Sequence, residues 1–78
     1  MTFAEIQKAE RERNAVIGDV IFHLIGSAED NANDTVYLEK EASEADFDRI
    51  ALSSLELNLG SCRDEIALQW FRDLGVKW

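Results

Sequence analysis

The stretch SEADFDRIALSSLELNLG, residues 43–60, decides the fold class of this 78-residue chain. From Phe47 to Leu55 its apolar side chains recur every three or four positions, which is the spacing of one face of an α-helix. From Leu55 to Leu59 apolar and polar residues alternate, which is also typical of a strand. A helix that continues to Gly60 predicts an all-α fold, whereas a strand at its end predicts a mixed one.

Before this stretch, a capping box and a long apolar stripe predict an N-terminal helix. Thr2 and Glu5 have the spacing at which a hydroxyl and a carboxylate satisfy the free N–H groups of a helix start. Apolar residues then recur at helical spacing as far as Ile25, and Gly26 follows as a stop signal. The stripe consists of Phe3, Ile6, Ala9, Val16, Ile17, Val20, Ile21, Leu24 and Ile25. We therefore expect one helix from about residue 3 to residue 25.

The next segment carries weaker signals. Residues 26–34, GSAEDNAND, are rich in loop-forming residues and are expected to form a connection. Residues 35–42 have mixed preferences, because Thr35–Leu38 favours a strand and the residues after it favour a helix. We expect either a short helix or an extended segment there.

The C-terminal residues predict another helix. Ser61 has the character of an N-cap, and Asp64 follows it three positions later. A narrow apolar stripe comes next and is expected to face the core; it consists of Ile66, Ala67, Trp70, Phe71 and Leu74. Gly75 has the position favoured for a left-handed C-terminal turn, after which Val76 can fold back on the helix.

Together these elements predict a single domain, residues 1–78, that folds as a small all-α bundle of three to four helices. The alternative is an α+β fold in which residues 35–41 and 55–59 form a short two-stranded element. The only cysteine is Cys62, so no internal disulfide is expected, and a reducing, cytoplasmic location is favoured. The sequence shows neither an apolar run long enough to span a membrane nor a signal-peptide pattern.

The charge is concentrated in the middle of the chain. The segment from Glu29 to Asp48 contains eight of the sixteen carboxylates and one base, Lys40, so it carries −7 of the total charge of −8. This balance disfavours direct binding to nucleic acid or to anionic lipid, both of which select clustered Lys and Arg. An acidic surface that recognises a basic protein surface is the expected functional feature.

The sequence offers little for catalysis or for cofactor binding. Residues 30–41 resemble an EF-hand calcium loop in length, but Ala32 cannot ligate a cation, and Thr35 replaces the glycine that the turn requires. His23 and Cys62 are too few for a zinc site, and a catalytic dyad formed by these two residues would lack a group that orients the histidine. We therefore expect no enzyme activity, no metal and no cofactor.

The leading hypothesis is a non-catalytic inhibitor that presents a carboxylate patch to a basic surface of a nuclease or nucleoprotein complex. Phage anti-restriction proteins, anti-CRISPR proteins and nuclease immunity proteins are similar in size and charge only. Tyr37 is the expected central anchor of the patch, because aromatic residues dominate binding energy. The expected partner-binding residues are Asp34, Tyr37, Glu39, Glu41, Glu44, Asp46 and Asp48. The alternative is an assembly subunit, such as a homodimer, that associates through the apolar stripe of the N-terminal helix.

Overall fold

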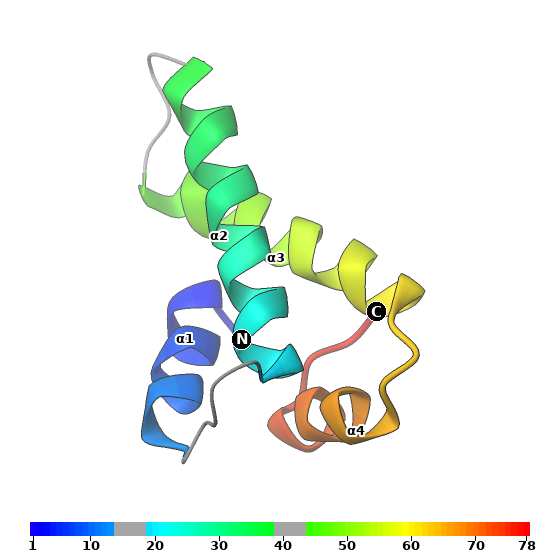
Figure 1. Cartoon of the computed structure of the whole chain (residues 1–78). Coiled ribbons are helices and arrows are strands. Elements are labelled where there is room, and N and C mark those ends of the chain that lie inside the picture. The colour runs from blue at the N-terminus through cyan, green and yellow to red at the C-terminus, as the bar shows by residue number, and fades with distance from the viewer. Residues whose placement is uncertain (14–18, 39–43) are drawn as a thin grey trace.

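The computed structural model describes residues 1–13, 19–38 and 44–78, and these residues form four helices and no strand. The helices are α1 (Phe3–Glu12), α2 (Val20–Leu38), α3 (Glu44–Ser61) and α4 (Glu65–Leu74). The two long helices, α2 and α3, cross each other, while α1 and α4 lie on either side of the lower part of α2 (Figure 1). The predicted small all-α bundle is confirmed, and the described residues of the alternative two-stranded element, 35–38 and 55–59, are helical.

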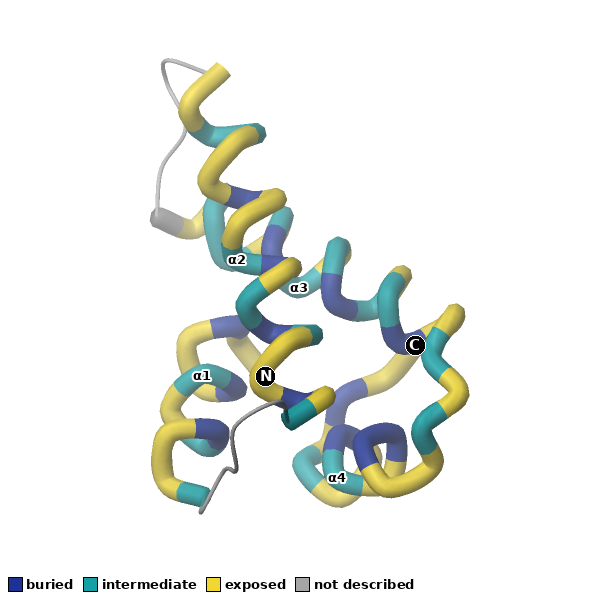
Figure 2. Tube along the Cα trace, in the orientation of Figure 1, coloured by how far each residue is buried: buried dark blue, intermediate teal, exposed yellow. Residues whose placement is uncertain are grey.

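Helix α3 supplies the central stripe of the core. Ala51 and Leu55 are completely buried and Leu59 is 1% exposed, whereas Leu57 is 76% exposed. In a strand Leu55, Leu57 and Leu59 would lie on one face and would be buried together. Because only Leu55 and Leu59 are buried, the burial pattern follows the helical period. The buried apolar residues of all four helices belong to one core cluster, and Figure 2 marks the buried positions in dark blue along each helix. Across this interior the rings of Phe3 and Phe47 meet edge to face, with their centroids 6.4 Å apart.

The prediction of one helix over residues 3–25 is wrong, because α1 and α2 are separate helices. The backbone at Arg13 is extended, with φ −92° and ψ 155°, and α2 begins after Asp19. The Asp19 carboxylate accepts a hydrogen bond of 3.0 Å from the Phe22 N–H, so it caps α2. The Arg13 guanidinium donates two hydrogen bonds, of 3.0 and 2.6 Å, to the same carboxylate. This pair joins the end of α1 to the start of α2, and residues 14–18, which include Val16, lie outside the described residues.

The predicted connection over residues 26–34 is also wrong, because these residues lie inside α2. Gly26, Asn31 and Asn33 favour loops. The segment nevertheless continues the apolar stripe that starts at Ile21, whose members follow one another at intervals of four, three and four residues. Packing of that stripe against the core outweighs the low helix propensity. Thr35–Leu38 forms the last turn of α2, and residues 39–42 lie outside the described residues. The buried stripe of α2 consists of Ile21, Ile25, Ala28 and Ala32.

Helix α4 was predicted, but it begins at Glu65 rather than directly after Ser61. Within the apolar stripe that was expected to face the core, Ile66 is 83% exposed and Trp70 is only half-buried. Its N-cap is Asp64, whose carboxylate accepts hydrogen bonds from the N–H groups of Ile66 and Ala67 at 3.0 and 3.1 Å. The expected cap at Ser61 is wrong, because this residue belongs to the last turn of α3. At the other end Gly75 adopts φ +101°, as expected, and Val76 folds back and is buried. The N–H groups of these two residues bond to carbonyls of the last turn, as in a Schellman motif.

Candidate functional site

One side of α2 faces away from the bundle and carries two carboxylates and an aromatic ring. Because a helix turns by about 100° per residue, Asp30, Asp34 and Tyr37 lie within about 60° of one another, opposite the buried stripe. His23 lies on the same line, two turns before Asp30. All four side chains are exposed. We call His23, Asp30, Asp34 and Tyr37 the outer stripe of α2.

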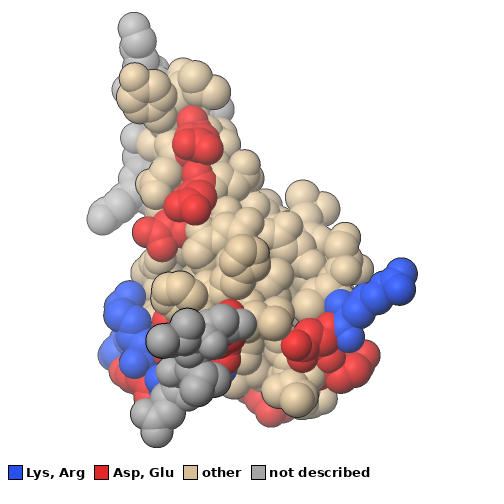
Figure 3. All heavy atoms as spheres, viewed as in Figure 1, with Lys and Arg blue, Asp and Glu red and all other residues tan. Residues whose placement is uncertain are grey.

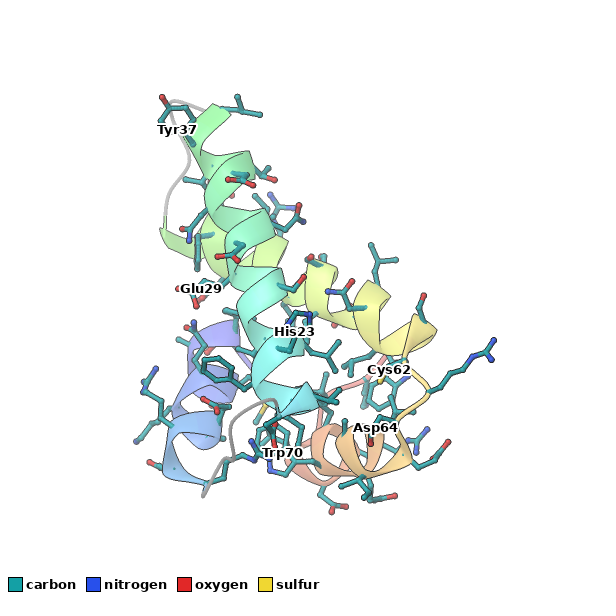
Figure 4. All side chains as sticks on the ribbon, in the orientation of Figure 1. His23, Glu29, Tyr37, Cys62, Asp64 and Trp70 are labelled. Atoms are coloured by element: carbon teal, nitrogen blue, oxygen red, sulfur yellow. The ribbon has the colours of Figure 1, made fainter. Side chains whose placement is uncertain are left out.

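The outer stripe ends at the tip of the longest helix. Tyr37 is 86% exposed and its neighbour Leu38 is 80% exposed. Figure 4 shows the Tyr37 ring at the upper end of α2, away from the other three helices. A large aromatic side chain that is almost fully exposed beside carboxylates can act as an anchor in a protein interface.

The basic residues lie elsewhere in the described part of the molecule. Helix α2 contains no Lys or Arg, and α3 contains only Arg49. Neither Asp30 nor Asp34 forms an ion pair with a described Lys or Arg. In Figure 3 red carboxylates follow the upper part of the molecule without blue neighbours, while the blue side chains visible in this view lie low on both sides, beside further carboxylates. The other described basic residues lie on or beside α1 and α4 and are Lys8, Arg11, Arg13, Arg63, Arg72 and Lys77.

The structure brings together only some of the predicted partner-binding residues. Asp34 and Tyr37 share the outer stripe. Asp46 and Asp48 are two positions apart on α3, so their side chains leave the helix about 200° apart and cannot form one face. Asp46 also forms an ion pair of 3.6 Å with Arg49. The remaining predicted positions, Glu39, Glu41 and the side chain of Glu44, lie outside the described residues.

Sequence reasoning missed two members of the outer stripe, Asp30 and His23. Both belong to the spacing i, i+7, i+11, i+14 that ends at Tyr37, and this signal is visible only if residues 26–34 are assigned to a helix. Glu29, by contrast, turns toward α1, where its carboxylate accepts a hydrogen bond of 2.8 Å from the Gln7 amide. The acidity of the segment is therefore divided between an outward stripe and contacts inside the bundle.

A second charged cluster joins three helices at the lower end of the molecule. The Arg13 guanidinium that binds Asp19 also lies over the Trp70 ring, 5.5 Å from its centroid. Hydrogen bonds from Arg13 lower the pKa of Asp19 below its ordinary value, and the same bonds raise the pKa of Arg13. Because both groups stay charged over a wide pH range and both side chains are largely buried, we interpret this cluster as structural.

The described residues do not assemble the catalytic or metal-binding groups that the sequence brought to attention. His23 lies on α2 and Cys62 follows α3, and Figure 4 shows them well apart. Asp30 to Leu38 is helical, so this part of the calcium-loop candidate is not a loop. No group of three or more His, Cys, Asp or Glu residues in the described part of the chain could hold a metal ion. None of the four helices is both long enough and apolar enough to cross a membrane, as far as the described residues extend.

The apolar stripe considered for assembly is directed mainly into the chain's own core. Ile21 is 4% exposed and Leu24 packs against the core, while Val20 is 39% exposed.

Comparison of the chain with protein-family models, with curated proteins and with solved structures gave no match. Among the predicted partner-binding residues, Asp34 and Tyr37 share one exposed side of α2, and this outer stripe is the candidate site.

Proposed function

We propose that this chain is a non-catalytic protein-binding module that places the outer stripe of α2 on a basic protein surface. One arrangement carries this proposal: Asp30 and Asp34 lie one helical turn apart on the side of α2 opposite the core, in line with the exposed Tyr37. Neither aspartate pairs with a Lys or Arg among the described residues, so both are available to a cationic partner, and their field accelerates the encounter.

The partner class follows from the charge. The outer stripe offers two negative charges in a row on a rigid helix, and a protein that handles nucleic acid offers Lys and Arg arranged for phosphates. A helix that occupies such a surface would block it. The specific form of the proposal is therefore an inhibitor of a nuclease or nucleoprotein complex, with Tyr37 as the apolar anchor and the two aspartates as the source of charge complementarity.

Tyr37 gives the proposal a quantitative expectation. Truncation of an aromatic hot-spot residue costs about 2 kcal/mol or more of binding free energy, which is roughly a thirtyfold loss of affinity. Because Tyr37 is 86% exposed, Tyr37→Ala leaves the stability of the free protein nearly unchanged. Loss of binding without loss of stability distinguishes an interface residue from a core residue.

The test compares two double variants that change the net charge equally. Asp30→Asn with Asp34→Asn alters the outer stripe, and Glu12→Gln with Glu56→Gln is the matched control on α1 and α3. The measurement is retention of a partner from host extract on the immobilised chain, followed by elution with rising salt up to about 0.5 M.

The wild type and the control should retain the same basic protein, and the outer-stripe variant should lose it or release it at lower salt. Equal retention by all three proteins would contradict the proposal. An equal loss in both variants would show that only net charge matters, which also contradicts a specific role for the stripe. Far-UV circular dichroism of each variant establishes that the helices are intact.

A further inference from the structure

A second surface lies at the other end of the molecule, where α4 faces the beginning of α2. A shallow groove of about 460 Å³ runs between these helices, and the apolar side chains of Ile21, Ile66 and Trp70 line it. A smaller hollow of about 120 Å³, lined in part by Val20 and Ala67, adjoins the groove and shares Ile21 and Ile66 with it. We call these two connected hollows the α2–α4 groove.

The apolar part of the α2–α4 groove is open to a partner. Ile66 is 83% exposed and Val20 is 39% exposed, although both are aliphatic residues that proteins usually bury. On α4, Ile66 and Trp70 are four positions apart and so lie on one side of the helix. Trp70 is half-buried, so part of its ring system remains available. These side chains give the groove an apolar wall that apolar side chains of a partner can contact.

The rim of the groove indicates the charge of the partner. Four carboxylates line the two hollows, and one guanidinium accompanies them. That guanidinium belongs to Arg13, which is already bound to Asp19 through two hydrogen bonds. Arg72 lies 4.0 Å from Glu65, and Gln69 donates a hydrogen bond of 2.8 Å to Asp73. Four carboxylates therefore face two guanidinium groups, and the rim remains negative, so a second copy of this acidic chain would be repelled and a cationic segment would be attracted. The four carboxylates belong to Asp19, Asp64, Glu65 and Asp73.

We propose that the α2–α4 groove binds an amphipathic, basic segment of a partner protein. Apolar side chains of that segment enter the groove between Ile66 and Trp70, and its Lys or Arg side chains pair with Glu65 and Asp73 on the rim. Grooves of this type accept helices through residues spaced i, i+3, i+4 and i+7. This site goes beyond the proposed function, because it shares no residue with the outer stripe of α2.

The test uses a defined probe and a local signal. The probe is a synthetic helix of about 14 residues, with leucines at i, i+3, i+4 and i+7 and lysines elsewhere. A control peptide has alanine in place of every leucine and carries the same charge. The protein carries Trp78→Phe, so that Trp70, which lines the groove, is the only tryptophan. Titration is followed by Trp70 fluorescence.

We expect a saturable change of Trp70 emission with the leucine peptide and none with the alanine peptide. Ile66→Ser should weaken binding at least about tenfold, because an apolar contact of this size contributes that much. Since Ile66 is largely exposed, this change leaves the fold intact. Asp30→Asn with Asp34→Asn should leave the affinity unchanged, so the result is independent of the fate of the proposed function.

Three results would overturn this inference. The first is the absence of a saturable signal, and the second is an affinity that Ile66→Ser does not alter. The third is concentration-dependent dimerisation of the free protein in sedimentation that Ile66→Ser abolishes, because the occupant would then be a second copy.

Discussion

Replacing Gly26 by alanine distinguishes the observed helix from the connection that the sequence suggested. Gly26 lies inside α2, its φ is not positive, and a Cβ built on it meets no atom within 4 Å. Alanine at an interior helix position makes the folded state more stable than glycine does, by about 0.5–1 kcal/mol, because the glycine backbone loses more entropy on folding. For a domain of this size, Gly26→Ala should therefore raise the melting temperature by about 2–8 °C.

The same substitution at Gly75 provides a control of opposite sign. Gly75 adopts φ +101°, a left-handed conformation that costs an L-residue about 1–2 kcal/mol. Gly75→Ala should therefore lower the melting temperature, although here too a Cβ would meet no neighbour. Both variants are measured by thermal and urea denaturation under one set of conditions. If Gly26→Ala destabilised the protein as Gly75→Ala does, residue 26 would end a helix in a left-handed turn, and the reasoning on α2 would be refuted.

Three further changes test the interior and the helix ends. In urea denaturation, Leu55→Ala should lower the free energy of unfolding by about 2–5 kcal/mol, because Leu55 is buried. Leu57→Ala on the exposed side should lower it by less than about 0.5 kcal/mol, and equal losses would contradict the helical assignment. Asp19→Asn should cost about 1–3 kcal/mol at neutral pH. Arg13 lowers the pKa of Asp19, so the ionised carboxylate stabilises the fold above its ordinary pKa, and this stabilisation is lost as the pH falls through the lowered pKa of the folded state. On acidification to about pH 3, Asp19→Asn should therefore lose less stability than the wild type does. Thr2→Ala removes the capping box and should lower the free energy of unfolding by about 0.5–2 kcal/mol, which thermal denaturation would show as a lower melting temperature. An unchanged melting temperature would count against that cap.

Local signals were sufficient where the elements depend on neighbouring residues. The capping box at Thr2 and Glu5 is formed, with hydrogen bonds of 3.0 and 3.2 Å. The left-handed Gly75 and the return of Val76 to the core were likewise predicted from short-range chemistry. Such signals lie within one helical turn, so they survive in a single sequence.

The N-terminal half could not be predicted because its structure depends on contacts between distant residues. An apolar stripe that resumes at helical spacing after Arg13 concealed the break between α1 and α2. Hydrogen bonds between Arg13 and Asp19 and the position of Trp70 beneath the guanidinium fix this break. Conversely, loop-forming residues concealed the middle of α2, where Ala28 and Ala32 are completely buried. In both places tertiary packing overrides local propensity.

The candidate site was predictable in composition but not in arrangement. The acidity of the central segment was evident, and Asp34 and Tyr37 were selected from it. The inclusion of Asp30 follows only from the helical assignment of α2. The separation of Asp46 from Asp48 already follows from the helix predicted over residues 43–60, because residues two positions apart on a helix face different directions. A loop gives no fixed direction to its side chains, whereas a helix assigns each one to a face.

A photo-crosslinking amino acid with an aromatic side chain, which keeps a ring at position 37, tests the central claim most directly. The exposed position tolerates the change, and an equivalent probe at position 12 on α1 serves as the control. Irradiation in host extract should attach a basic protein to position 37 but not to position 12, and about 0.5 M salt should suppress the adduct. The same adducts at both positions, or an adduct at position 37 that salt does not affect, would contradict recognition of a basic surface by the outer stripe of α2.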